Sequence, residues 1–280
     1  MQQLLSSPEI QSAVLPFAVA LLIYLGLRKL TETAWLWALC AAFLLSAGLI
    51  NGTTFTPLTG TRKIILLVAA SFAIAALLPA VLQGRNRQRV ALALICLSAL
   101  SWVFWTVASR MQPGAITLLA LGCAALVACL ALSFERIAGN TAKLHGAGLG
   151  LLLGTGLSAT AAASALLGQL GLALAAASGG AFLGWVLVGG AHGSNQGRHT
   201  ISTLPYVLAP ASLGVAAVMF ASLPWYALIP LAAIPLAVSL VPLKADSRFL
   251  RALLASLPAL AIAIAVALWV WQTSGSDSGY

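Results

Sequence analysis

Residues 144–193 read LHGAGLGLLLGTGLSATAAASALLGQLGLALAAASGGAFLGWVLVGGAHG, and this stretch decides the fold. From Leu144 to Ala191 it contains no Lys, Arg, Asp or Glu. As one helix these residues would extend about 72 Å, whereas the hydrocarbon core of a bilayer is roughly 30 Å thick. The stretch therefore predicts a hairpin of two membrane-spanning helices. We place its turn at Gly168 and Gln169, with Gly171 just beyond, because they are the flexible and polar residues near its middle.

Small residues recur every four positions on both predicted helices. On the first helix they are Gly146, Gly150, Gly154, Ser158 and Ala162. On the second they are Ala176, Gly180 and Gly184. Small residues allow helix backbones to approach closely in lipid, where little hydrophobic force drives helices together. We interpret the two rows as a glycine zipper that closes the hairpin; the alternative is that glycine is simply frequent in membrane helices.

The composition of the whole chain is that of a membrane protein. Hydrophobic residues make up 61% and charged residues 7% of the 280 residues, and the mean hydropathy is +1.03. A soluble domain has about one quarter charged residues. We predict an all-α polytopic integral membrane protein: a single transmembrane helical domain over residues 1–272, with residues 1–140 and 141–272 as alternative halves, and a short polar tail over residues 273–280.

About ten transmembrane helices with short loops are expected. The first is interpreted as a retained anchor rather than a signal peptide, because Arg28 and Lys29 follow its apolar run instead of preceding it. Besides the Gly-rich hairpin, which supplies spans six and seven, the expected spans cover residues 12–27, 34–50, 64–82, 90–108, 115–134, 204–222, 225–241 and 249–271.

The basic residues predict the orientation. Eleven of the 14 Lys and Arg fall in the odd-numbered connections of the ten-span plan. By the positive-inside rule these connections face the cytoplasm, and both termini lie outside a bacterial-type inner (plasma) membrane. Counting the Gly-rich stretch as one span would leave seven basic residues on each side, so the charges also favour the hairpin. Arg62 and Lys63 are exceptions to the rule.

Few residues suggest chemistry. His145 and His192 are about equally far from the predicted turn, so they could meet and hold a haem or a transition metal; the alternative interpretation is two ordinary interfacial histidines. Pro230 and Pro235 should break the ninth span, and broken helices in transporters mark binding sites. Hydroxyls such as those of Thr155, Ser158 and Thr160 could line a polar path, although most such groups bond the i−4 carbonyl of their own helix.

The remaining patterns exclude several classes of function. The four cysteines lie in apolar runs without metal-ligand spacing, and no phosphate-binding or hydrolase motif is present. The net charge of +9 is assigned to lipid headgroups rather than to nucleic acid. All five acidic residues lie at span ends or in loops, which disfavours ion coupling through a buried carboxylate. We expect neither enzymatic activity, nor a cofactor, nor a metal.

Three functional hypotheses remain. The leading one is a permease-type carrier of a small, weakly polar or amphipathic solute, with its pathway between the Gly-rich hairpin and the ninth span. The main alternative is a non-catalytic integral membrane subunit that packs within a larger complex or a homo-oligomer. The third is a haem- or quinone-associated subunit. The size and span number look like those of the drug/metabolite transporter group, but the predicted outside termini differ from that group and no motif carries over, so we assign no family.

Overall fold

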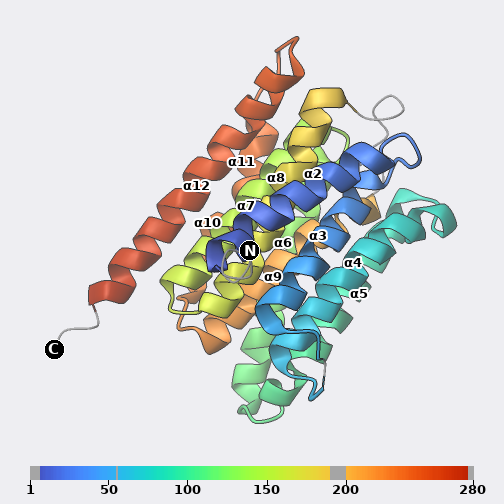
Figure 1. The fold of residues 1–280 in the computed structure, drawn as a ribbon. Helices are drawn as coiled ribbons and strands as arrows, with labels where there is room; N and C mark the ends of the chain where they lie inside the picture. The colour runs from blue at the N-terminus through green and yellow to red at the C-terminus, as the bar shows by residue number, and fades with distance from the viewer. Residues whose placement is uncertain (1–6, 55, 190–199, 277–280) are drawn as a thin grey trace.

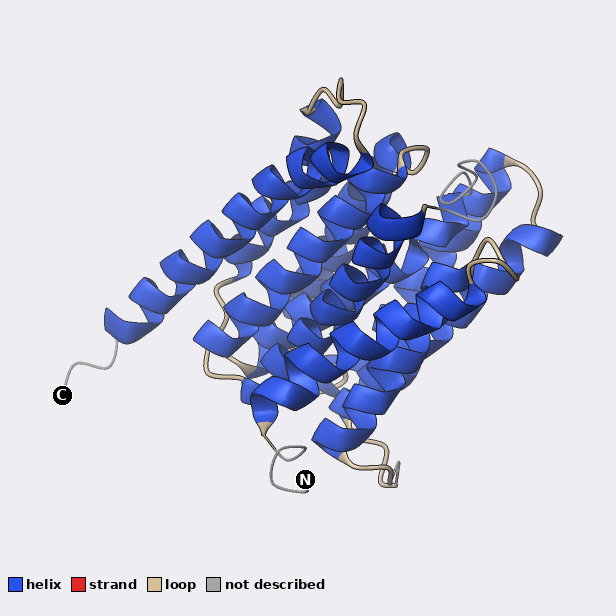
Figure 2. Cartoon of the chain, turned by 45° about the horizontal axis from the view of Figure 1, so that its top comes forward, coloured by secondary structure: helices blue, strands red, loops and turns tan. Residues whose placement is uncertain are grey.

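The computed structural model describes residues 7–54, 56–189 and 200–276, and within these ranges all regular secondary structure is helical (Figures 1 and 2). In chain order the helices are η1 (Ile10–Val14), α2 (Leu15–Leu27), α3 (Ala34–Asn51), α4 (Gly60–Val81), α5 (Arg85–Ala108), α6 (Pro113–Ile137), α7 (Thr141–Ala161), α8 (Ala165–Val188), η2 (Thr200–Thr203), α9 (Leu204–Phe220), η3 (Trp225–Ala227), α10 (Leu228–Ala232), α11 (Ile234–Leu240) and α12 (Arg248–Ser276).

The protein is a polytopic membrane protein. Eight of the described helical segments are long and apolar enough to cross a bilayer. α7 is also of spanning length, with 21 residues, but its glycines and His145 lower its hydropathy. The shorter apolar segment Trp225–Leu240 contains η3, α10 and α11. With that broken ninth segment the elements follow the predicted ten-span plan in order, and the all-α class is confirmed.

The turn of the Gly-rich hairpin lies about five residues earlier than predicted. α7 ends at Ala161 and α8 begins at Ala165. Ala163 adopts a left-handed conformation with φ of 66°, and Ser164 caps α8 by accepting a hydrogen bond from the Leu167 amide. Gln169 is therefore a helical residue, not a turn residue. The turn is formed by the capping residue Ser164 next to the strained Ala163. Gly168 and Gly171, which suggested a later turn, have a different role.

Those glycines are contact points between α7 and α8. A Cβ atom added to Gly171 would lie 2.6 Å from the Gly156 Cα atom, and one added to Gly156 would lie 2.7 Å from the Leu172 amide nitrogen. A Cβ atom on Gly168 would collide with the Thr160 side chain. The hairpin is thus closed by glycines that the i, i+4 rows do not contain.

The two predicted rows of small residues do not pack on each other. Gly146, Gly150 and Gly154 of α7 face α12, where added Cβ atoms would meet Ala255, Ala259 and Ala263. Gly180 and Gly184 of α8 face α2, against the Phe17 backbone and the Tyr24 ring. Ala176 is half-buried on α8. The prediction of a zipper between the hairpin helices was therefore wrong: the α7 row accepts the alanines of α12, and the α8 row accepts the Phe17 backbone and the Tyr24 ring of α2.

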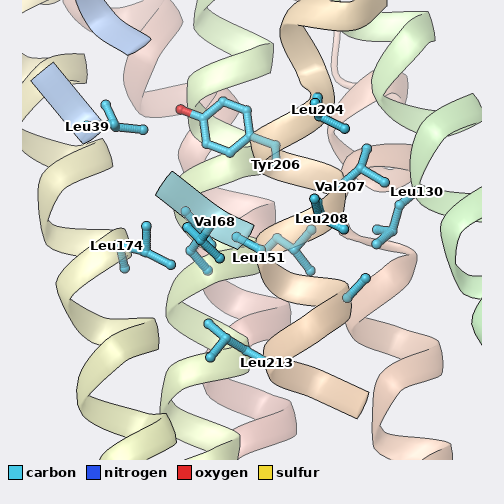
Figure 3. Packing of buried hydrophobic residues seen from close by; sticks show 14 of the residues in the cluster. Leu39, Val68, Leu130, Leu151, Leu174, Leu204, Tyr206, Val207, Leu208 and Leu213 are labelled. Atoms are coloured by element: carbon cyan, nitrogen blue, oxygen red, sulfur yellow. The ribbon is translucent and has the colours of Figure 1, made fainter. Parts of the chain in front are cut away.

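The core centres on α7 and α9. α7 packs against α8, α9, α11 and α12, while α9 packs against α4, α6 and α7. Nearly all of α9 is buried, including every residue from Leu204 to Ala217. Figure 3 shows Leu204, Val207, Leu208 and Leu213 of α9 packed with core residues of other helices. α12 lies at the edge of the bundle in Figures 1 and 2.

Basic side chains gather at one end of the bundle, which we call the basic end. It comprises the end of α2, the start of α5, the connection from α6 to α7 and the start of α12. There the exposed Arg85 and Arg89 pair with the largely buried carboxylate of Glu135, which joins α5 to α6. We call the other end, where the α7–α8 turn lies, the opposite end.

The two exceptional basic residues at the opposite end have structural partners. The Arg62 guanidinium donates to the Pro57 carbonyl at 2.7 Å and to the Thr54 hydroxyl at 3.3 Å. The Lys63 amino group donates to the Trp102 carbonyl at 3.4 Å and lies 5.4 Å from the centroid of the Trp102 ring. These residues tie the α3–α4 loop to α4 and α4 to α5, while the third basic residue of that end, Arg110, is exposed just beyond α5.

The glycine contacts with α12 predict a stability effect. In Gly150→Ala the new methyl group would lie 2.8 Å from the Ala259 carbonyl carbon and cannot fit without moving the helices apart. We expect it to lower the free energy of unfolding by about 1–3 kcal/mol, the usual cost of overpacking. Thermal unfolding in detergent measures this. Gly122→Ala is the matched control: nothing lies near its new methyl group, so it should leave stability unchanged or raise it.

Membrane orientation can be tested with cysteines at the two ends. Ala165 is exposed beside the α7–α8 turn, and Lys244 is exposed at the basic end. From the charge bias, we expect an impermeant thiol reagent to label Ala165→Cys in intact cells and Lys244→Cys only after the membrane is opened. The native cysteines are first replaced. The reverse pattern would show that the protein is inserted with the opposite orientation.

Candidate functional site

A hydrogen-bonded network of three polar side chains lies in the core. The Tyr206 hydroxyl of α9 is 3.0 Å from His145 Nδ1 of α7 and 3.0 Å from the Ser178 hydroxyl of α8. All three residues are at most 1% exposed. His145 and Tyr206 stand one turn or so from the basic ends of their helices, so the network links three helices near that end. Gly148 makes room for it, since any Cβ atom there would overlap the Tyr206 ring.

Aromatic rings enclose the network. Trp35 stacks on Tyr206 with 5.6 Å between ring centroids and meets the His145 ring edge-on at 5.0 Å. Phe134 stacks on Tyr206 with 5.7 Å between centroids, and Phe182 lies 5.6 Å from His145. Rings from α3, α6 and α8 thereby seal the junction of α7 and α9 from both lipid and water.

His145 retains one unsatisfied atom. Its Nε2 has no hydrogen-bond partner among the described residues, whichever tautomer the Tyr206 bond selects. A buried polar atom without a partner costs free energy. His145 is fully buried inside the bundle, about one turn from the basic end of α7. His192 lies outside the described residues, so the proposed histidine pair is not tested.

A second feature lies farther along the same two helices, where the broken span fills notches made by glycine. A Cβ atom on Gly154 of α7 would lie 2.6 Å from Leu231 Cδ2, and one on Gly214 of α9 would lie 2.9 Å from Leu228 Cδ2. Leu228 and Leu231 both belong to α10. The two leucines thus plug the junction of α7, α9 and the ninth span midway through the bundle.

The prolines break the ninth span as predicted. Pro230 lies inside α10, and α11 begins with Pro235 in its first turn. Because proline has no amide hydrogen, the carbonyls of Tyr226 and Leu231 lose their i+4 donors. α11 instead gains an outside partner at its end: the Lys143 amino group donates to the Ser239 carbonyl at 2.8 Å. The ninth span is therefore two short helices held at one end by a lysine.

A hollow of about 510 Å³ opens at the opposite end, beyond the leucines. It is lined by residues at the ends of three helices and at the start of η3: Ala162, Ala163, Phe220, Ala221, Ser222, Pro224, Tyr226, Thr273 and Ser274. No charged side chain is among these lining residues. The hollow lies between the hairpin turn and the ninth span, the two elements between which the carrier hypothesis placed its pathway.

The hydroxyls of α7 mostly stay within their own helix. Thr155 and Thr160 donate to the i−4 carbonyls of Leu151 and Gly156, as the simpler interpretation predicts. Ser158, on the row that faces α12, is buried and its hydroxyl has no partner among the described residues. Among those residues, no group of three or more His, Cys, Asp or Glu side chains could hold a metal.

Sequence reasoning missed Tyr206, Ser178 and Trp35. A tyrosine directly after Pro205 in an otherwise apolar run was a usable signal, since a buried hydroxyl needs a partner. The identity of its partners was not readable, because His145 is 61 residues away along the chain. Neither the comparison with protein-family models nor that with curated proteins finds a match.

The shared tyrosine predicts non-additive mutational effects. Tyr206→Phe removes both hydrogen bonds and leaves His145 and Ser178 unpaired, so we expect it to cost about 1–3 kcal/mol of stability. Ser178→Ala should cost less, and adding it to Tyr206→Phe should cost almost nothing further. Thermal unfolding of the four proteins measures the coupling. Tyr226→Phe, at a half-exposed position, serves as the control, and strict additivity of the two core substitutions would contradict a shared network.

Proposed function

We propose that this protein is a permease-type carrier of a small, weakly polar or amphipathic solute in a cell membrane, with the basic end in the cytoplasm. One observation carries the proposal: along the junction of α7 and α9, a hollow, a leucine plug and a sealed polar network follow one another from the opposite end to the basic end. A carrier needs such a series, because its pathway must be closed at one end while it is open at the other.

The plug is built from a part that can move. α10 and α11 are short, and Pro230 and Pro235 supply no amide hydrogen to the carbonyls of Tyr226 and Leu231, so tilting these helices breaks fewer backbone hydrogen bonds than tilting an uninterrupted helix. Withdrawal of Leu228 and Leu231 from Gly214 and Gly154 would extend the hollow toward the network. The glycine surfaces left behind are smooth and admit a weakly polar solute without exposing charge.

The network would act as the gate at the basic end. It consists of hydrogen bonds between α9 on one side and α7 and α8 on the other, so separating these helices breaks two hydrogen bonds and the edge-on contact of the His145 and Tyr206 rings. Such a gate closes firmly and reversibly. The unpaired Nε2 of His145 becomes reachable when the gate opens, where water or solute can satisfy it.

Flux measurements on plug variants test carriage. Purified protein in proteoliposomes is assayed with radiolabelled glycerol, a monoacylglycerol and an alkylamine as probes. We expect saturable, protein-dependent flux of at least one probe, and we expect Leu231→Ala to change that flux about tenfold, since removal of a buried leucine side chain is worth more than the 1.4 kcal/mol that a factor of ten requires.

Leu236→Ala is the matched control, because Leu236 lies on the same broken span but is 37% exposed. Its flux should equal that of the unaltered protein, and thermal unfolding confirms that both variants fold. Flux no greater than in empty liposomes for every probe, or identical flux in Leu231→Ala and Leu236→Ala, would remove the proposed pathway. Recovery of stoichiometric foreign chains after gentle extraction would favour the alternative, a subunit of a larger complex.

A further inference from the structure

α12 follows α7 closely for only half of its length. Over the half near the basic end, Ala255, Ala259 and Ala263 lie against the glycines of α7. Toward the opposite end the two helices separate, and a groove of about 540 Å³ opens between them. In Figures 1 and 2 the C-terminal half of α12 correspondingly extends away from the rest of the bundle.

This groove is apolar and faces the lipid. Its walls come from α7, from the α7–α8 turn and from α12: Leu157, Thr160, Ala161, Ala163, Ile264, Ala267, Leu268 and Trp271. Thr160 is its one hydroxyl, and that group already donates to the Gly156 carbonyl. Ile264, Leu268 and Trp271 are 48%, 49% and 65% exposed, so the groove opens sideways into the bilayer rather than toward water.

The groove continues into the hollow described above. Ala163 lines both spaces, and on α12 the groove ends at Trp271 where the hollow begins at Thr273. A molecule could therefore occupy both at once, with its apolar part between α7 and α12 and its polar part in the hollow. Each space falls within the volume range of small-molecule sites.

The wall of the hollow favours one chemical class for the polar part of such a molecule. α7 and α9 end at it, with their C-caps Ala162 and Ala221 in its wall, and Thr273 and Ser274 belong to the last turns of α12. The last carbonyls of a helix have no donors from their own helix, and helix C-termini carry partial negative charge. Three converging C-termini favour hydrogen-bond donors and cations. α8 begins at Ala165 and contributes none of the residues that line the hollow.

We propose that the groove and the hollow form one binding site for a single-chain amphiphile that enters sideways from the membrane leaflet at the opposite end. The apolar chain lies between α7 and α12, and a non-anionic headgroup that donates hydrogen bonds occupies the hollow. This proposal rests on the proposed carrier function in one respect: the amphiphile bound here is the carried solute. A lateral site delivers such a molecule directly above the leucine plug.

Photolabelling in nanodiscs tests the site. Three probes share one dodecyl chain with a diazirine and differ in the headgroup, which is glycerol, ammonium or sulfate. We expect saturable labelling of segments 157–163 and 264–271 by the glycerol and ammonium probes, competed by unlabelled monoacylglycerol. The sulfate probe should label about tenfold less, because three helix C-termini repel it.

A substitution that fills the groove is compared with the same substitution outside the groove. Ala267→Phe places a ring between α7 and α12, whereas Ala265→Phe places the same ring on an exposed position of α12 outside the groove. Saturable labelling should fall about tenfold in the first variant and stay unchanged in the second, with equal thermal stability showing that both fold. Unsaturable labelling spread over all lipid-facing helices, or equal labelling of the two variants, would overturn the site, and equal labelling by the sulfate probe would overturn its headgroup preference.

The photolabelling and flux experiments together distinguish the binding-site proposal from the proposed carrier function. Specific labelling together with absence of monoacylglycerol and alkylamine flux would leave a binding site and refute its role in transport. Saturable flux of glycerol without specific labelling would leave a carrier and refute the amphiphile site.

Discussion

Close approach at glycine is the constraint on which this bundle depends. α7 has glycines on three faces, and each face accepts a different neighbour: Gly150 accepts α12, Gly148 accepts the Tyr206 ring of α9, and Gly156 accepts α8. Helices in lipid gain most of their association energy from contact at short range, so a helix without side chains on several faces becomes the centre of the packing. The remaining helices are arranged around that centre, and even the broken span enters through a glycine notch at Gly154.

The sequence predicted the spans well and the partners poorly, for a physical reason. Span number follows from hydropathy and from the impossibility of exposing backbone to lipid, and both are local properties. The i, i+4 row of Gly146, Gly150 and Gly154 correctly marked a contact face, but a face of small residues does not encode which helix will cover it. The turn was misplaced for a related reason: glycine near the middle of a long apolar stretch is ambiguous between a break and a contact, and Gly168 and Gly171 are contacts.

The candidate site was even less accessible to sequence reasoning. Pro230 and Pro235 were correctly predicted to break their span, because a missing amide hydrogen acts locally. The network of His145, Ser178 and Tyr206 instead requires three helices to meet at one depth, and hydrogen bonds spanning 28 and 61 residues cannot be read from spacing. Burial makes the hydrogen bonds of that network strong. Water cannot compete for these groups in the core, so the helices that carry them are held together until something else satisfies the polar atoms.

The two ends of the α7–α9 junction are therefore held with different strength. At the basic end, hydrogen bonds join α9 to α7 and α8, stacked rings join α9 to α3 and α6, and the ion pairs of Arg85 and Arg89 with Glu135 join the neighbouring α5 and α6. At the opposite end, a groove opens between α7 and α12 beyond Ala263, and Leu228 and Leu231 of a proline-broken segment fill the notches at Gly214 and Gly154. Movement should begin where the fewest polar bonds must break, so the ninth span and the outer half of α12 are the parts that yield first. The glycines of α7 permit this difference between the two ends of the junction, because a helix surface without side chains keeps its shape when a neighbouring helix moves away.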